Sequence, residues 1–127
     1  MRKEDAMELI LSIPWPPTEN KIWRTSRSMM YSSEKYKQFS TLTFLMVKQQ
    51  LPRTFEKFAG PVRVTLDLYP PTRQSYDIDN RIKPTLDALT KSAVWEDDDQ
   101  VVELIVRKRS VVKRGKAEVR IEEVNNE

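Results

Sequence analysis

Apolar and polar side chains alternate along two stretches of the chain, residues 7–13 and 62–69. A period of two residues predicts half-buried strands, because successive side chains of a strand point to opposite faces. Residues 100–107 and 117–124 follow the same pattern more briefly. We predict that they form a third and a fourth strand, joined as a hairpin across residues 113–116.

Two other stretches repeat their apolar side chains every three or four residues, which predicts helices. The first helix is expected to start at Ser33, which with Glu34 can cap it, and to end near Gln50 before Pro52. Its core-facing stripe comprises Tyr36, Phe39, Thr43, Phe44 and Val47. Residues 18–32, which carry several basic side chains, are predicted to form an ordered loop.

The second helix is expected to run from Asp79 or Asn80 to Ser92. Its buried stripe comprises Ile82, Leu86 and Leu89. Pro84 lies inside this pattern and lacks a backbone donor, so we expect a distorted first turn.

The order strand, helix, strand, helix and two strands predicts an α+β fold. We expect residues 1–127 to form a single two-layer domain, a mixed β-sheet with two main helices on one face. A chain of 127 residues is long enough to bury a core without disulfides or structural metals.

The composition excludes several kinds of active site. The chain has no cysteine and no histidine, so thiolate chemistry and Ser-His-Asp triads are impossible. Only two glycines are present, which excludes glycine-rich phosphate loops. Any catalysis must use carboxylates, lysine, hydroxyl groups and hard cations. The sequence shows no signal peptide and no apolar run of membrane-spanning length, so we expect a soluble, cytoplasmic protein with no membrane partner.

Two acidic clusters carry the candidate chemistry. The first is Asp77-Ile78-Asp79-Asn80, followed at helical spacing by Lys83 and Asp87, and the second is the run 96–99. If the second helix packs beside the third strand, carboxylates from both clusters can converge. An all-oxygen ligand set suits Mg²⁺ or Mn²⁺ and phosphoryl chemistry.

Each cluster also has an ordinary structural interpretation, which the sequence leaves open. Asp79 can cap the second helix. Asp79 with Lys83, and Asp87 with Lys91, can form i,i+4 ion pairs. The run 96–99 can be a solvated turn.

Residues 107–116 contain six basic side chains and no acidic one. Together with Lys21, Arg24 and Arg27, and with Trp23 available for stacking, they predict a surface that tracks phosphates. The alternative is a charged rim that protects a sheet edge.

The motifs resemble those of the RusA family of Holliday junction resolvases. The resemblance rests on a D-x-D-N-x-x-K pattern at 77–83, a D-A-L helix at 87–89 and a D-D-x-Q-V strand entry at 97–101. The opening at 13–20, Ile-Pro-Trp-Pro-Pro-Thr-Glu-Asn, is also similar, and the likeness runs from about residue 9 to the end.

The resemblance implies a RusA-like fold and a homodimeric, Mg²⁺-dependent endonuclease, with Mn²⁺ as a substitute ion. Such an enzyme makes paired symmetric nicks in four-way DNA junctions during recombination and repair, in bacteria or phages. It implies that Asp77, Asp79 and Asp98 bind the metal and that Lys83 is catalytic. Supporting positions are Asn80, Asp87 and Asp97.

One segment departs from the family pattern. The arginine-rich run before the first aspartate is replaced by Thr72-Arg73-Gln74-Ser75-Tyr76, which keeps one arginine. The predicted DNA-binding residues come from this segment and from the basic stretches described above. They are Lys21, Arg24, Arg27, Arg73, Arg107, Arg109, Lys113 and Arg114.

Two other functions remain to be distinguished from a resolvase. One is a protein that binds branched DNA without cutting it, and the other is a Mg²⁺-dependent hydrolase of small phosphate esters. The basic stretch at 107–116 argues against the second, because a small substrate needs no extended basic track. Polynucleotide binding weakens steeply with salt, whereas turnover of a small ester does so much less.

Overall fold

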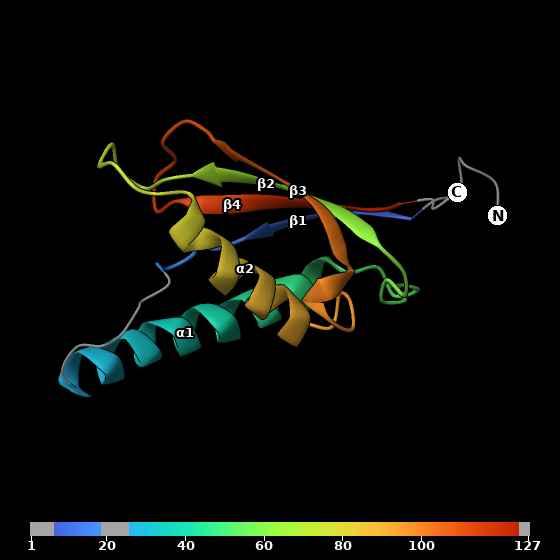
Figure 1. Ribbon diagram of the computed structural model, residues 1–127, viewed down its shortest axis with the longest axis horizontal. Coiled ribbons are helices and arrows are strands. Elements are labelled where there is room, and N and C mark those ends of the chain that lie inside the picture. The colour runs from blue at the N-terminus through green and yellow to red at the C-terminus, as the bar shows by residue number, and fades with distance from the viewer. Residues whose placement is uncertain (1–6, 19–25, 125–127) are drawn as a thin grey trace.

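The computed structural model describes residues 7–18 and 26–124. A four-stranded sheet forms one layer, and both main helices cover the same face of it (Figure 1). This arrangement confirms the predicted α+β class, the mixed sheet and the two helices. The elements are β1 (Glu8–Ile13), α1 (Ser26–Gln50), β2 (Val62–Tyr69), α2 (Asp79–Lys91), the 3₁₀ helix η2 (Asp98–Gln100), β3 (Val101–Lys108) and β4 (Lys116–Glu123).

The strand order in the sheet is β1-β4-β2-β3. β4 lies antiparallel to both β1 and β2, whereas β2 and β3 are parallel and are connected through α2. The predicted hairpin of the last two strands is therefore wrong, because β2 lies between them. Parallel neighbours need a crossover, and α2 supplies it across the covered face.

The connection from β3 to β4 crosses the end of β2 instead of turning back. Its backbone is tied there, since Arg109 N donates to Leu68 O at 2.7 Å and Val112 N to Pro70 O at 2.9 Å. Gly115 has φ +70°, and a Cβ on it would lie 2.8 Å from the Pro71 ring. Only glycine fits this close approach without strain.

α1 begins at Ser26, so the predicted loop over 18–32 is wrong for residues 26–32, and Ser33 and Glu34 lie inside the helix. Serine favours caps but is tolerated in helices, so Ser33 followed by Glu34 is a misleading start signal. Phe39, Thr43 and Val47 of the predicted stripe are buried, whereas Phe44 is 39% exposed.

α2 runs from Asp79 to Lys91 without a break at Pro84. Its first turn is closed by a hydrogen bond from Arg81 N to Ile78 O at 3.0 Å, which spans three residues instead of the four of a regular α-helix. The buried side chains are Pro84, Thr85, Ala88 and Leu89, so the predicted stripe is correct for Leu89 and only partly for Ile82 and Leu86.

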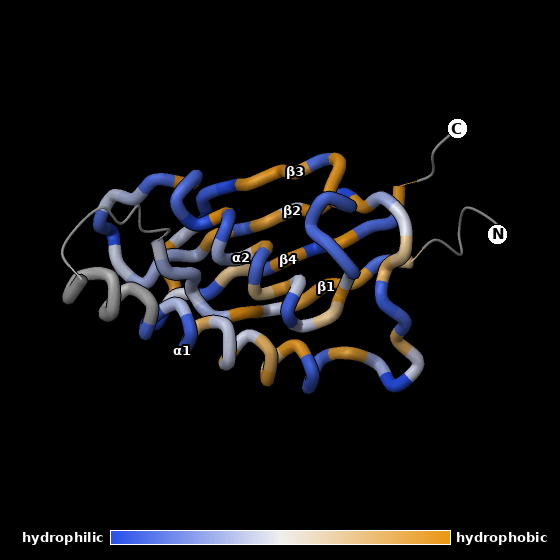
Figure 2. Tube along the Cα trace, turned by 60° about the horizontal axis from the view of Figure 1, so that its bottom comes forward, coloured by the Kyte–Doolittle hydropathy of each residue, from blue (hydrophilic) through white to orange (hydrophobic). Residues whose placement is uncertain are grey.

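The core lies between the sheet and the helices, and Figure 2 shows its apolar positions recurring along the strands behind α2. Val62, Val64, Leu66 and Leu68 of β2 are fully buried, as their alternation predicted. In the described part of the chain, no helix has the length and apolar character needed to cross a membrane.

Candidate active site

The acidic motif residues are distributed over three pieces of backbone beside α2. Asp77 lies in the loop between β2 and α2, and Asp79 is the first residue of α2. Lys83 and Asp87 follow on successive turns of the same helix. Asp98 is the first residue of η2, directly before β3. Because α2 links the parallel strands β2 and β3, the two acidic segments flank one crossover.

The middle of α2 carries a connected group of polar side chains. Lys83 Nζ lies 3.5 Å from Asp87 Oδ1, and the Tyr36 hydroxyl of α1 donates to Asp87 Oδ2 at 2.8 Å. Each oxygen of Asp87 therefore has its own partner. The predicted i,i+4 partners of these residues were Asp79 for Lys83 and Lys91 for Asp87, and the ion pair seen is Lys83 with Asp87 instead.

Tyr36 was expected only as part of the core stripe of α1. It is half-buried and directs its hydroxyl to Asp87. No local sequence pattern predicts this contact, because the two residues are 51 positions apart. A tyrosine at the edge of an apolar stripe is a weak signal for such a role, since its ring can pack while its hydroxyl finds a partner.

The turn that carries Asp98 is held by its neighbours. Asp97 Oδ1 accepts from Asp99 N, and Gln100 Oε1 accepts from Glu96 N and Asp97 N at 2.8 and 3.0 Å. Gln100 Nε2 donates to Phe58 O and Gly60 O, both at 2.9 Å. The run 96–99 is thus an ordered capped turn, and Gln100 ties it to the segment before β2.

Asp98 lies in an electrostatically unfavourable position for a carboxylate. Burial raises its pKa, the hydrogen bond and charge of Asp97 and the charge of Asp87 raise it further, and Lys83 opposes them. This places Asp98 in the same local field as Asp87 and Lys83. A carboxylate facing other carboxylates is stabilised by a bound cation, and this arrangement is typical of functional sites.

The donor set suits a hard cation such as Mg²⁺, because every candidate ligand is a carboxylate oxygen. Within residues 7–18 and 26–124, however, no three acidic side chains are close enough together to hold an ion. η2 packs against α2, and the charges of Asp87 and Lys83 act on Asp98, whereas Asp77 and Asp79 are exposed at the start of α2. Asn80, beside them, is half-buried.

Asp79 does not cap α2. The N-cap position is Ile78, which has helical backbone angles, and no side-chain cap hydrogen bond is present there. The structural interpretation of Asp79 as a cap is therefore wrong. A carboxylate in the first turn is still favoured by the helix dipole, but its oxygens are not used by the backbone.

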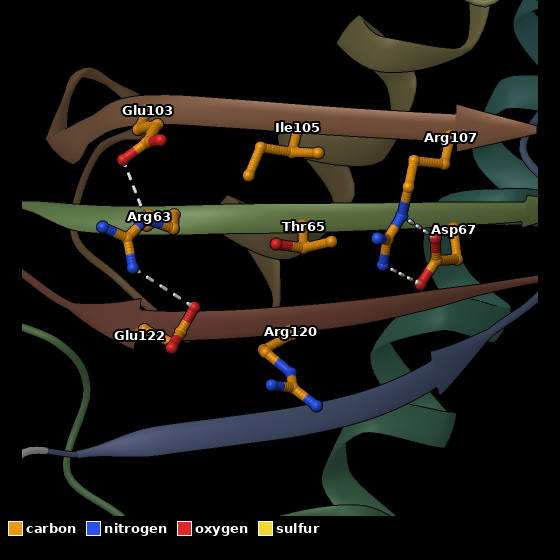
Figure 3. Close-up of a pocket in the computed structure, with 8 residues that line it drawn as sticks. All are labelled: Arg63, Thr65, Asp67, Glu103, Ile105, Arg107, Arg120 and Glu122. Carbon is orange, nitrogen blue, oxygen red and sulfur yellow. Dashed lines mark hydrogen bonds and ion pairs between the residues drawn. The ribbon is translucent and has the colours of Figure 1, made fainter.

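Two of the predicted DNA-binding arginines belong to an ion-pair network on the uncovered face of the sheet. Arg107 Nε lies 2.8 Å and Arg109 Nε 3.1 Å from Asp67 Oδ1. Figure 3 shows Arg107 and Asp67 together, on a face where Arg63 also bridges Glu103 and Glu122. These arginines lie across the sheet from α2 and are matched by acids.

The other predicted DNA-binding residues have different settings. Arg73, Lys113 and Arg114 are exposed in loops at the end of the sheet where β2 finishes. Lys21 and Arg24 lie outside the described residues, and for Arg27 only the backbone, in α1, is described.

Comparison with known proteins identifies the family. The model of the family described as endodeoxyribonuclease RusA matches residues 14–122. The crossover junction endodeoxyribonuclease RusA of Escherichia coli K12 is 33% identical over 117 residues, which cover 92% of this chain and 96% of that protein. The protein of the same name from enterobacteria phage 82 matches equally well. The chain belongs to the RusA family.

Family membership bears out the resemblance in the motifs. The matched range of this RusA-family chain contains both acidic segments, Lys83 and the Tyr36–Asp87 contact. It also contains Arg73, Lys113 and Arg114. The side chains grouped around Asp98 are therefore part of the shared domain and not of an appended segment.

Proposed function

We propose that this RusA-family chain is a crossover junction endodeoxyribonuclease that resolves Holliday junctions in the bacterial cytoplasm. The observation that carries the proposal is the packing of η2 against α2, which exposes Asp98 to the charges of Asp87 and Lys83. The carboxylates and the ammonium group that a phosphodiesterase without histidine needs are on adjacent elements. The names of the relatives support DNA junctions as the substrate.

Asp77, Asp79 and Asp98 would hold Mg²⁺, with Mn²⁺ as a substitute. The ion supplies Lewis-acid chemistry, polarising a phosphate oxygen and lowering the pKa of a water molecule. The carboxylates lie on a loop, a helix terminus and a 3₁₀ turn. Binding therefore requires the side chains of the exposed Asp77 and Asp79 to turn toward Asp98, on a backbone that stays where it is. Asp97 and Gln100 hold the turn of Asp98 while this happens.

Lys83 carries the positive charge of the site. Its side chain is more than half exposed and its Nζ lies 3.5 Å from Asp87 Oδ1, so the ammonium group can leave this weak ion pair and approach a phosphate. There it stabilises the additional negative charge that develops during displacement at phosphorus. Asp87, oriented by Tyr36, keeps Lys83 on the side of α2 that faces Asp98.

A homodimer completes the proposal. A four-way junction has approximate two-fold symmetry, so an isologous dimer presents two equivalent sites to two strands. Paired symmetric nicks follow from this geometry. Sedimentation should give roughly twice the chain mass of 15.0 kDa, and a monomer at micromolar concentration would contradict paired nicking.

The proposal is tested with a labelled mobile four-way junction and a linear duplex, each with and without Mg²⁺. Asp79→Asn should abolish cleavage and preserve junction binding, since the amide keeps the shape but loses the charge. Asp99→Asn is the matched control, because Asp99 is an exposed acid of the second cluster.

Symmetric nicks on the junction alone, dependent on metal and on Asp79, would support the proposal. Binding without cleavage in Mg²⁺ and Mn²⁺ would favour a binding-only protein. Equal cutting of duplex would leave a metal nuclease without junction specificity.

A further inference from the structure

Four side chains from four separate segments meet beside the start of α2, and we call them the Trp15 clamp. They are Trp15 after β1, Tyr76 before α2, Arg81 in the first turn of α2 and Lys108 at the end of β3. The Trp15 and Tyr76 rings meet edge to face, with centroids 5.1 Å apart and planes at 85°. Both rings also pack against the hydrophobic core.

Arg81 occupies the centre of the Trp15 clamp. Its guanidinium carbon lies 4.7 Å from the Trp15 ring centroid and 5.8 Å from that of Tyr76, and Nη1 donates to the Pro16 carbonyl. Burial lowers the pKa of Arg81, and its buried Nε has no hydrogen-bond partner within the described residues. An apolar side chain would pack here at a lower desolvation cost. The guanidinium instead connects three backbone segments at one point.

Lys108 holds the other side of Tyr76. Its Nζ donates to the Tyr76 carbonyl at 2.8 Å and lies 4.5 Å from the centroid of the Tyr76 ring. That carbonyl belongs to the peptide bond between Tyr76 and Asp77. Lys108 therefore fixes the peptide plane from which Asp77 begins, and connects it to the last residue of β3.

The clamp holds both ends of the segment 77–80, because Tyr76 precedes this segment and Arg81 follows it. Within it, Asp77 and Asp79 are exposed. Across the described residues, neither of these two side chains forms a hydrogen bond or an ion pair. A segment tethered closely at both ends has fewer conformations to lose than a longer one. The clamp thus restricts both carboxylates without touching them.

We propose that Arg81 and Lys108 are positioning residues that fix the two ends of segment 77–80, so that Asp77 and Asp79 are held within reach of a divalent cation. The identification of both aspartates as cation ligands rests on the proposed function. Loss of either basic residue lengthens the mobile part of the loop, and metal affinity falls. Residues that orient ligands from outside typically contribute 10- to 100-fold in this way.

Arg81→Met and Lys108→Met test the proposal, because methionine keeps an unbranched apolar stem and removes the charge and donors. Arg53→Met is the matched control. Arg53 is an exposed arginine in the segment after α1, outside the clamp, and its replacement removes the same charge. Mn²⁺ binding to the DNA-free protein is measured by water proton relaxation, and amide hydrogen exchange is followed at residues 77–81. Junction affinity in EDTA and urea unfolding complete the comparison.

Both clamp variants should bind Mn²⁺ about 10- to 100-fold more weakly than wild type, with faster amide exchange at 77–80. Their junction affinity should equal that of Arg53→Met. If Arg81→Met is too unstable to assay, Lys108→Met decides, because Lys108 is exposed and lies outside the core.

Unchanged Mn²⁺ binding and exchange in Lys108→Met would overturn the proposal. So would normal Mn²⁺ binding with a loss of junction affinity beyond that of Arg53→Met, which would make these residues DNA contacts. A wild-type protein that binds Mn²⁺ and leaves junctions uncut would contradict the proposed function alone, since the metal-binding comparison needs no cleavage.

Discussion

Asp67 and Asp98 lie on opposite sides of the sheet layer, and their neighbours affect their charges in opposite ways. Burial would raise the pKa of Asp67, but hydrogen bonds and charges from Arg107 and Arg109 outweigh it and lower that pKa. Asp98 is also partly buried, yet its neighbours are Asp97 and Asp87, and its pKa is raised. Lys83 opposes this only as the last contribution.

The difference separates a carboxylate whose charge stabilises the fold from one that we propose to bind a cation. On the uncovered face, acidic side chains form ion pairs with arginines, so their charges are compensated within the protein (Figure 3). Beside α2, acids face acids, which costs stability unless a cation binds. Arginines in a basic run are therefore weaker evidence for a DNA surface than the sequence suggests, because Arg107 and Arg109 already have a carboxylate partner.

The largest expected effect is the difference in cleavage activity between neutralising Asp98 and neutralising Asp67. Asp98→Asn removes a proposed metal ligand and should lower cleavage of a four-way junction by at least about 10³-fold. Asp67→Asn should leave cleavage within about threefold of wild type. Single-turnover assays at saturating Mg²⁺, with junction binding measured in parallel, compare the two. Equal activity of both variants would remove Asp98 from the site.

Lys83→Ala should lower the cleavage rate by about 10²- to 10³-fold, because a charge aimed at the phosphate is lost. Mn²⁺ binding should persist, since lysine is not a ligand. Lys91→Ala removes the same charge two turns further along α2 and serves as the control. Unchanged rates in Lys83→Ala would show that the group around Asp98 does not act through this lysine.

Local patterns in the sequence predict the strands and both helices, because burial on one face imposes a period on each. These patterns do not predict the strand order, because no local sequence feature shows that the chain after β3 crosses the end of β2 and inserts β4 beside β1. The start of α1 was also placed late, since Ser33 and Glu34 resemble a cap. Tertiary packing, which decides both features, joins residues distant in the sequence.

The sequence points to the acidic residues of the candidate site, but not to the side chains that orient them. The two acidic clusters stand out in one sequence, and the resemblance to the RusA family singles out Asp77, Asp79 and Asp98 among them. The Tyr36–Asp87 hydrogen bond and the position of Arg81 between two rings depend on contacts across 51 and 66 positions. The side chains that orient a site come from wherever the fold brings them.

Gln100→Ala should have a smaller effect, a loss of about 10- to 100-fold in cleavage with junction binding retained. The four hydrogen bonds of the Gln100 side chain hold the turn that carries Asp98. Water molecules can take over these hydrogen bonds, but they do not fix the turn to the segment before β2. Gln49→Ala, at an exposed position of α1, is the control. A cleavage rate equal to that of the control would mean that the capped turn holds its shape without Gln100.

The smallest effect is on stability, and its sign should differ between the two aspartates. The lowered pKa of Asp67 means that its charge stabilises the fold above the ordinary value of 3.8, and that this contribution is lost as the pH falls. The raised pKa of Asp98 means that ionisation destabilises the fold as the pH rises through that pKa. At pH 7 without metal, Asp67→Asn should therefore lower the melting temperature by a few degrees and Asp98→Asn should raise it slightly.

Both differences from wild type should shrink in thermal melts at pH 3, where both carboxyl groups become protonated in the unfolded chain. A melting temperature lowered by Asp98→Asn at pH 7 would contradict the comparison, because it would show that Asp98, like Asp67, is an acid that the fold needs in its charged form. Added Mg²⁺ sharpens the contrast. The ion should stabilise wild type and Asp67→Asn alike, since ligands that bind only the folded state raise its stability, and should have little effect on Asp98→Asn.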